Sequence, residues 1–142
     1  AARGKGATVE AKVIDVVGGD VAGRKVALWG LTFKARTDDR RESPALHIAR
    51  RLLEAGAVLS AHDPTVETAL AELPEVEVVA DAYAAVEGAE ALVVLTEWDD
   101  FRWLDFDKVV AAMARPNVVD TRNLLDRAAL VRRGVRYEGL GR

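Results

Sequence analysis

Residues 34–42 are the part of the sequence best suited to chemistry, because seven of these nine side chains are charged. The cations among them are Lys34, Arg36, Arg40 and Arg41, and they stand directly before a predicted helix. A helix N-terminus adds a partial positive charge and unpaired backbone N–H groups. Arginine suits phosphate because its planar fork donates two parallel hydrogen bonds. The pattern indicates an anion site, and a solvated loop of mutually paired charges is the alternative interpretation.

Two further polar stretches, residues 96–105 and 120–126, also follow predicted strands. The carboxyl ends of parallel strands meet at one edge of a sheet, and doubly wound folds bind their ligands there. We therefore expect Arg122 to close the same anion site from another strand, with Asp120 orienting it. Trp98 and Trp103 are expected to cover this rim of the sheet.

Other combinations of residues point to little chemistry. His47 and His62 have no partners at a spacing that suits zinc, so no metal site is predicted. Ser43 is interpreted as a helix cap rather than a nucleophile. The dinucleotide fingerprint G-x-G-x-x-G is absent after the first predicted strand, where Gly30 stands alone. A side-chain anion site fits this turn better than a complete dinucleotide site, and no catalytic residue is predicted.

The elements that must position these residues alternate along the chain. Apolar runs predict strands at 25–30, 57–62, 76–80, 91–96 and 117–120, with a possible edge strand at 135–140. Helical patterns occupy 43–57, 66–73, 81–89, 105–114 and 126–134. This alternation predicts an α/β fold: a doubly wound, Rossmann-like parallel sheet with helices on both faces.

Residues 1–17 stand apart from the alternating pattern. Val9, Val13, Val16 and Val17 predict a narrow helical stripe, which glycines separate from the rest of the chain. We interpret this segment as the end of a longer helix that begins upstream. The lack of an initiator Met gives the same expectation, that the chain is a fragment of a longer protein.

The composition narrows the class of protein. The chain has 142 residues, the size of one domain, and a net charge of -3, which argues against a broad nucleic-acid surface. Because it has no cysteine, a disulfide scaffold and a thiolate nucleophile are excluded. No apolar run reaches the ~18 residues of a membrane span. These features are compatible with a cytoplasmic protein that contacts neither nucleic acid nor membrane.

Several motifs together resemble a known family. They are "GLTFKARTDDRRESPAL" (30–46), "HDP" (62–64), "TEWDDF" (96–101), "DTRNLLD" (120–126) and "GLGR" (139–142). The chain from about Gly23 onward is similar to the C-terminal domain of the UDP-glucose/GDP-mannose dehydrogenase family. "TEWDDF" is most similar to the UDP-glucose 6-dehydrogenase branch.

The resemblance implies an oxidoreductase that uses NAD. Such an enzyme has an N-terminal NAD-binding domain, a long central helix that dimerises, and a C-terminal domain that closes over the UDP-sugar. It oxidises the sugar C6 alcohol to a carboxylate in two NAD-dependent steps, through a thioester on a cysteine. Residues 1–22 would then be the end of the dimerisation helix and a linker, and residues 23–142 the UDP-sugar-binding domain. The parent enzyme would be a homodimer or larger.

The resemblance also implies roles for individual residues. Phe33 and Lys34 would contact the UDP-sugar, Arg122 would bind the substrate, and Arg41 would face NAD across the domain cleft. The chain departs from the family at Thr121, where a glycine is usual, and in lacking the catalytic cysteine and the NAD-binding fingerprint. This chain alone is therefore expected to be inactive.

Three functional interpretations remain open from the sequence. The first is the substrate-binding domain of a UDP-glucose 6-dehydrogenase. The second is the same domain of an enzyme acting on GDP-mannose or on a UDP-N-acetyl-sugar. The third is a free-standing nucleotide-binding module without catalysis.

Overall fold

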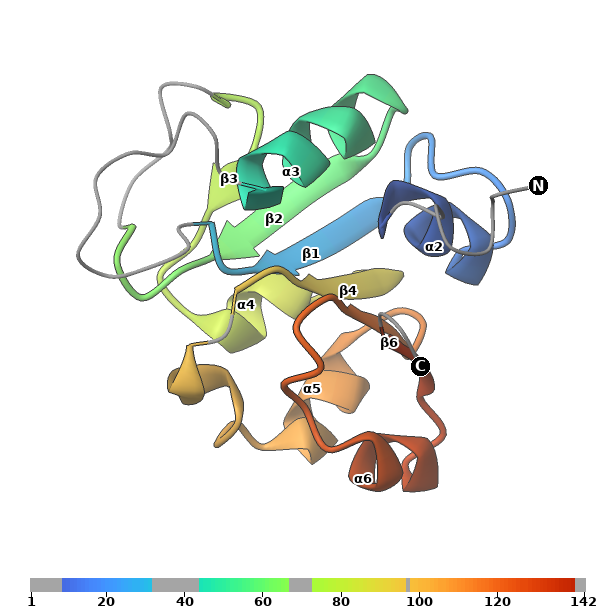
Figure 1. Ribbon diagram of the computed structural model, residues 1–142, viewed down its shortest axis with the longest axis vertical. Coiled ribbons are helices and arrows are strands. Elements are labelled where there is room, and N and C mark those ends of the chain that lie inside the picture. Colours follow the sequence, from blue (N-terminus) through green and yellow to red (C-terminus); the bar gives the residue numbers. More distant parts are fainter. Residues whose placement is uncertain (1–8, 32–43, 67–72, 97, 140–142) are drawn as a thin grey trace.

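All six strands of the central sheet run parallel, as the alternating sequence pattern predicted (Figure 1). The computed structural model describes residues 9–31, 44–66, 73–96 and 98–139. The strands are β1 (Lys25–Trp29), β2 (Val58–His62), β3 (Glu77–Val78), β4 (Ala91–Val94), β5 (Asn117–Asp120) and β6 (Arg136–Gly139). Their order across the sheet is β3-β2-β1-β4-β5-β6, so the predicted edge strand is confirmed as β6.

The central strands are mostly apolar, as strands covered by helices on both faces should be. Every residue of β4 and β5 is buried, and in β1 only Lys25 is partly exposed. The edge strand β3 is shorter than predicted, since only Glu77 and Val78 pair with β2. β4 ends at Val94, although the next N–H group, that of Leu95, still donates to the Trp29 carbonyl at 2.9 Å.

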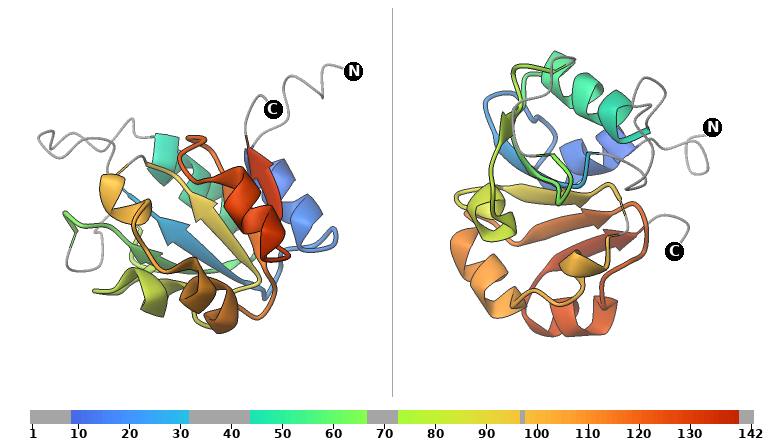
Figure 2. Two further views of the ribbon diagram at one scale, coloured as in Figure 1. Left: turned by 90° about the horizontal axis from the view of Figure 1, so that it is seen from below. Right: turned by 90° about the vertical axis from the view of Figure 1, so that its left-hand side faces the viewer.

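The helices form two layers on opposite faces of the sheet, which Figure 2 shows from the side. They are α2 (Val9–Val16), α3 (Pro44–Glu54), α4 (Ala82–Val86), α5 (Phe106–Ala112) and α6 (Arg127–Arg132), with a 3₁₀ turn, η1 (Asp99–Phe101). α2 and α3 share one hydrophobic core with the sheet, whereas α4, α5 and α6 share the other. The predicted helix at 66–73 lies largely outside the described residues.

Aspartates begin three of these helices at the predicted positions. The carboxylates of Asp81, Asp105 and Asp126 each accept a backbone N–H of the first turn of α4, α5 and α6. α3 begins at Pro44, also as predicted, while Ser43 lies outside the described residues.

The end of α3 depends on Gly56. Its φ of +99° is in the left-handed region, and its N–H donates to Leu53 while the N–H of Ala57 donates to Leu52. This pair of bonds satisfies the last carbonyls of the helix and turns the chain into β2. An added Cβ on Gly56 would also meet Ala22 Cα at 3.1 Å, so a side chain is disfavoured on two grounds.

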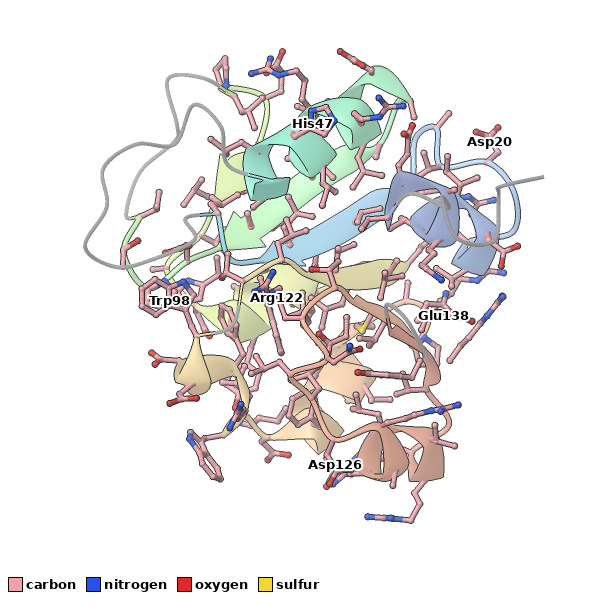
Figure 3. All side chains as sticks on the ribbon, in the orientation of Figure 1. Asp20, His47, Trp98, Arg122, Asp126 and Glu138 are labelled. Carbon is pink, nitrogen blue, oxygen red and sulfur yellow. The ribbon has the colours of Figure 1, made fainter. Side chains whose placement is uncertain are left out.

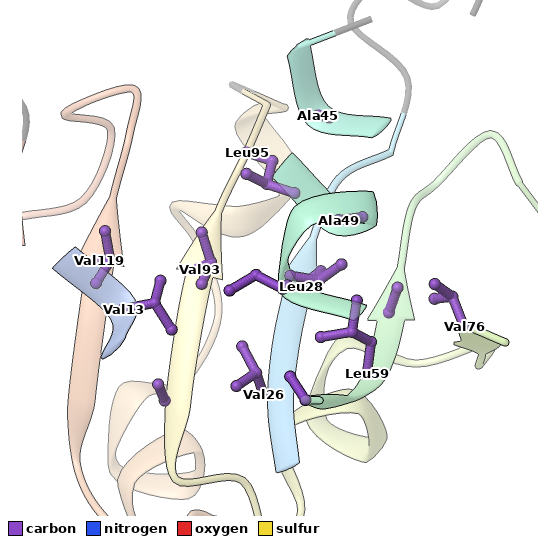
Figure 4. Packing of buried hydrophobic residues seen from close by; sticks show 14 of the residues in the cluster. Val13, Val26, Leu28, Ala45, Ala49, Leu59, Val76, Val93, Leu95 and Val119 are labelled. Atoms are coloured by element: carbon purple, nitrogen blue, oxygen red, sulfur yellow. The ribbon is translucent and has the colours of Figure 1, made fainter. Parts of the chain in front are cut away.

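Small aliphatic side chains fill the core between the sheet and the layer of α2 and α3. Figure 4 shows Val26 and Leu28 of β1 packed among Leu59, Ala49 and Val93 from neighbouring elements. The core on the opposite face contains the aromatic residues. There the ring of Trp29 stacks on Phe101 with centroids 5.1 Å apart, and its Nε1 donates to the Ala82 carbonyl at 3.2 Å.

The predicted valine stripe is confirmed as α2, and it packs directly on the sheet. Val13 and Val17 are fully buried in the first core. Polar contacts add to this packing: Arg136 of β6 binds Asp15 at 2.8 Å, and Arg115 donates to the Val17 carbonyl at 3.2 Å. α2 therefore belongs to the same packed unit as the sheet, and its extension upstream stays a prediction.

α2 also meets α3 through one ion pair. Arg51 of α3 donates to Glu10 of α2 at 2.8 Å, and this hydrogen bond raises the pKa of the Arg51 guanidinium. The pair is exposed to solvent, so it orients the two helices more than it stabilises them.

Candidate functional site

The strand order reverses between β1 and β4, and doubly wound folds bind their ligands in a crevice beyond the carboxyl ends of the strands at such a reversal. The chain proceeds from β1 outward to β2 and β3, then returns to place β4 on the other side of β1. Of the chain that leaves β1, the structure describes Gly30 and Leu31. The residues at this edge come from β1, β2, β4 and β5.

Gly30 follows β1 at the crevice, and no other residue fits its position. Its φ is +100°, and an added Cβ would lie 1.9 Å from Thr96 Oγ1. Thr96 is the second residue after β4, so the chain that leaves β1 packs directly against the chain that leaves β4 at this point. The N–H of Gly30 donates to the His62 carbonyl at 2.8 Å, which continues the ladder between β1 and β2. The single glycine noted in the sequence thus allows close packing of backbone against Thr96.

Asp63 follows β2 and fixes the path of the chain beyond Gly30. The side chain is 1% exposed, and its Oδ2 accepts the N–H of Leu31 at 2.6 Å. Its Oδ1 accepts the N–H and the hydroxyl of Thr65, both at 2.7 Å. Hydrogen bonds to a carboxylate are stronger than neutral ones, which favours a charge at this buried position. Asp63 thereby sets the start of the segment that carries Phe33 and Lys34.

Asp120 is the last residue of β5 and organises the opposite side of the crevice. It is fully buried, and its Oδ1 accepts the N–H of Arg122 at 3.1 Å. Its Oδ2 accepts the N–H of Leu125 at 2.8 Å and the hydroxyl of Tyr137 at 2.8 Å. The loop of residues 121–125 therefore folds round a single carboxylate. We expected Asp120 to orient the guanidinium of Arg122 or to pair with it, and this stays a prediction; the bond described here is to the backbone N–H.

Thr121 holds the start of this loop against β4. Its N–H and its hydroxyl both donate to the Val94 carbonyl, at 3.0 and 2.7 Å. Thr121 has an ordinary negative φ, whereas Asn123 is the one non-glycine residue with positive φ, at 51°, in the described part of the chain. The departure from the family glycine at 121 is thus accommodated without strain there.

Arg122 projects from this loop with an exposed side chain, at the edge where the sequence predicted it (Figure 3). An arginine at this exposed position can bind a phosphate through its planar guanidinium, and the buried Asp120 holds its backbone N–H. Phe33, Lys34 and Arg41 lie outside the described residues. Whether Lys34 and Arg122 point into one pocket therefore stays a prediction.

Two buried polar atoms in the segment after β4 have no hydrogen-bond partner among the described residues. They are Thr96 Oγ1 and Trp98 Nε1, both in the segment that follows β4. Buried donors of this kind are uncommon in folded proteins. The Thr96 hydroxyl and the Trp98 indole N–H donate no hydrogen bond to any residue that the structure describes.

The two rim tryptophans differ in environment. Trp98 is partly buried, as expected for a residue that covers the rim, but Trp103 is 81% exposed. The expectation was wrong for Trp103, because the turn after η1 directs it outward. Trp103 stands between two open hollows, of ≈ 420 and ≈ 470 Å³, on the side of α4, α5 and α6.

The sequence did not indicate two residues that shape this edge. Asp63 was part of a quoted motif, but nothing near it revealed that it binds Leu31. Tyr137 lies in a weak edge-strand pattern, and only the pairing of β5 with β6 brings it to Asp120. Within the described residues, no group of three or more His, Cys, Asp or Glu side chains could hold a metal ion. No helix in the same ranges is long and apolar enough to cross a membrane.

Comparison with known proteins identifies the family to which these features belong. The family model for "UDP-glucose/GDP-mannose dehydrogenase family, UDP binding domain" matches residues 27–127. The chain belongs to the UDP-glucose/GDP-mannose dehydrogenase family. The match runs from β1 to the first residue of α6, so it contains the whole carboxyl edge described above, although not Tyr137.

Individual members of the UDP-glucose/GDP-mannose dehydrogenase family are similar over most of this chain. It is 42% identical over 132 residues to a UDP-glucose 6-dehydrogenase of Rhizobium meliloti, covering 92% of this chain and 30% of that protein. It is 46% identical over 127 residues to the corresponding protein of Pseudomonas aeruginosa, covering 84% of this chain and 28% of the relative. The chain thus spans less than a third of the length of these relatives.

Solved structures of the UDP-glucose/GDP-mannose dehydrogenase family share the fold. An NDP-N-acetyl-D-galactosaminuronic acid dehydrogenase from Methanosarcina mazei superposes with a TM-score of 0.79 at 28% identity, over 94% of this chain and 28% of that one. A UDP-glucose dehydrogenase from Pyrobaculum islandicum gives 0.71 at 34% identity, over 92% of this chain and 28% of that one.

Proposed function

We propose that this chain is the UDP-sugar-binding domain of a UDP-glucose 6-dehydrogenase, an enzyme that oxidises UDP-glucose to UDP-glucuronate with NAD. The observation that carries the proposal is the match to a UDP-binding domain over residues 27–127, the part of the chain that builds the crevice between β1 and β4. Residues 1–22 would then be the end of a dimerisation helix and a linker. An upstream domain of the same polypeptide would supply the catalytic cysteine and the main NAD site.

The substrate would lie across the crevice with its diphosphate at the carboxyl edge. Arg122 would bind the substrate from the loop after β5, and Phe33 and Lys34 from the segment after β1. Arg41 would face NAD across the cleft between the domains. The loop that carries Arg122 is well suited to this task, since its backbone is held by the buried Asp120 and a fixed backbone reduces the ordering that binding requires.

NAD itself does not fit the turn after β1 in the manner of a dinucleotide-binding domain. In such domains several glycines in this turn let the pyrophosphate approach the backbone closely. Here Gly30 stands alone, and Thr96 already fills the space beside it. The absence of cysteine likewise leaves this chain without a nucleophile for the thioester.

The choice of nucleotide and sugar rests on the relatives. Two of them, at 42% and 46% identity, are UDP-glucose 6-dehydrogenases, and "TEWDDF" agrees with that branch. The alternative substrates are GDP-mannose and UDP-N-acetyl-sugars, since a GDP-mannose dehydrogenase and UDP-N-acetyl-mannosamine dehydrogenases share the fold at 27–28% identity. A cytoplasmic location stays a prediction from the sequence.

Calorimetric titration of the purified chain with UDP, GDP and NAD tests the proposal. We expect UDP to bind more tightly than GDP, and NAD to bind weakly or not at all. Tighter binding of GDP would favour the GDP-mannose alternative. Reduction of NAD by the chain alone in the presence of UDP-glucose would overturn the assignment of catalysis to another domain.

Replacing Arg122 tests its role in the full-length dehydrogenase. A charged hydrogen bond contributes roughly 1.5–3 kcal/mol, so Arg122→Ala should raise the KM for UDP-glucose about tenfold to hundredfold. Arg127→Ala is a suitable control, because Arg127 is also an exposed arginine but begins α6. An unchanged KM in the Arg122 variant would mean that this arginine belongs to a solvated surface.

A further inference from the structure

The loop that carries Arg122 is held by a hydroxyl from another strand. Tyr137 belongs to β6, the edge strand next to β5, and is 7% exposed. Its hydroxyl donates to Asp120 Oδ2 at 2.8 Å, the same oxygen that accepts the Leu125 N–H. Because the register pairs Tyr137 with Val118, the phenol reaches along β5 to the end of the strand.

The buried carboxylate couples this hydroxyl to the backbone of Arg122. Oδ1 of Asp120 accepts the Arg122 N–H, and Oδ2 accepts donors from Leu125 and Tyr137. A rotation of the carboxyl group would weaken both backbone bonds together. The phenol restricts this rotation, since it binds one oxygen from outside the loop. Satisfying a buried carboxylate in this way also limits the cost of its desolvation.

We propose that Tyr137 is a positioning residue for Arg122, acting through Asp120 to direct the guanidinium toward the UDP-sugar. This inference rests on the proposed function, because it takes Arg122 to contact the substrate. Tyr137 lies outside the residues matched to the UDP-binding domain, which end at 127. A residue of the edge strand thereby contributes to substrate affinity, although it does not contact the substrate in this proposal.

The test is Tyr137→Phe in the full-length dehydrogenase. Phenylalanine keeps the ring in the core and removes only the hydroxyl. We expect the KM for UDP-glucose to rise about fivefold, the size of one lost hydrogen bond. The kcat and the KM for NAD should change less than about twofold, because the hydroxyl touches neither the reacting atoms nor the cofactor in this proposal.

The chain offers a matched control in its second tyrosine. The hydroxyl of Tyr83 accepts the Asp105 N–H at 2.8 Å, on the same face of the sheet but at the start of α5. Tyr83→Phe removes the same atom and should leave the KM for UDP-glucose unchanged. An equal rise in KM in both variants would overturn the proposal, because it would indicate a general loss of structure.

A double-mutant cycle separates positioning from a merely structural role. In an Arg122→Ala enzyme, Tyr137→Phe should raise the KM less than about twofold further, because the residue being positioned is gone. A full second increase would overturn the proposal. So would a Tyr137→Phe enzyme that loses kcat together with affinity, or that does not fold.

The same cycle distinguishes this inference from the proposed function. If Arg122→Ala itself leaves the KM unchanged, the substrate role of Arg122 fails and the positioning role fails with it. If Arg122→Ala raises the KM while Tyr137→Phe does not, only the positioning role is overturned.

Discussion

Two buried aspartates stand on either side of the crevice, and they hold their loops in different ways. Asp63, after β2, binds the N–H of Leu31 beyond β1 and the N–H and hydroxyl of its near neighbour Thr65. Asp120, at the end of β5, binds two N–H groups of its own loop and the hydroxyl of Tyr137 from β6. Asp63 reaches across to the backbone just beyond the central strand β1, whereas Asp120 receives a side chain from the edge strand β6.

The two aspartates therefore differ in how much of the sheet a single substitution of one of their partners would disturb. Asp63 fixes the point where the chain leaves β1, so a change there affects the centre of the sheet. At Asp120 one partner is a phenol that can be removed without altering any strand. We therefore expect substitutions on the Asp63 side to act mainly on stability and those on the Asp120 side mainly on substrate affinity.

Gly30→Ala should have the largest effect, and it tests the Asp63 side. A side chain at a φ of +100° costs roughly 1–3 kcal/mol in backbone strain. The clash with Thr96 should add roughly 1–3 kcal/mol. Chemical denaturation of the isolated chain measures the loss in the free energy of unfolding.

Gly18→Ala is the matched control for this prediction. Gly18 has a φ of +103°, but an added Cβ there meets nothing within 4 Å. Its variant should show the backbone strain alone. If both variants lose the same free energy of unfolding, the contact between Gly30 and Thr96 contributes nothing.

Asp63→Ala should come next, with a loss of about 3 kcal/mol in the free energy of unfolding. The N–H of Leu31, a fully buried residue, would lose its acceptor, and the bonds to Thr65 would be lost as well. Asp20→Ala is the control, since Asp20 accepts the Ala22 N–H at 3.0 Å in a similar local turn that is exposed. Denaturation curves in which the two variants coincide would contradict the anchoring role of Asp63.

Thr121→Val should have the smallest effect on stability and a measurable effect on binding. It removes the hydroxyl bond to the Val94 carbonyl but keeps the N–H bond to the same atom. Denaturation of the isolated chain should show a loss of about 1 kcal/mol in the free energy of unfolding. In the full-length dehydrogenase of the proposed function, kinetic assays should show roughly a threefold rise in the KM for UDP-glucose.

Thr65→Val sharpens the comparison between the two sides. It removes a hydroxyl bond of equal length, 2.7 Å, to the carboxylate of Asp63. Because the acceptor is charged, we expect a larger loss of about 1.5–3 kcal/mol in the free energy of unfolding. A greater loss for Thr121→Val than for Thr65→Val would reverse the distinction drawn between the two anchors.

The sequence predicted the sheet well because local patterns determine much of it. The near-continuous apolar runs at 25–30 and 91–96 favoured strands buried on both faces, and aspartates stood at the starts of three predicted helices. The length of β3 was harder to predict, since an edge strand ends where its neighbour stops pairing with it. That end depends on β2 rather than on the residues of 76–80 themselves.

The site was predicted only in part for a similar reason. Arg122 could be assigned to the carboxyl edge because it directly follows a predicted strand. The contact between Asp120 and Tyr137 joins two strands whose adjacency follows from the order of the whole sheet. No local pattern carries that information. The roles of Phe33, Lys34 and Arg41 stay predictions.

The position of β6 at the edge of the sheet has a consequence for dynamics. An edge strand has a neighbour on one side only, so it opens by local unfolding more readily than the central strands do. Each opening of β6 withdraws the Tyr137 hydroxyl from Asp120 and releases the loop of Arg122 for that interval. The fraction of time for which Arg122 is correctly directed is therefore linked to the protection of β6 amides against hydrogen exchange, and warming the protein should reduce both together.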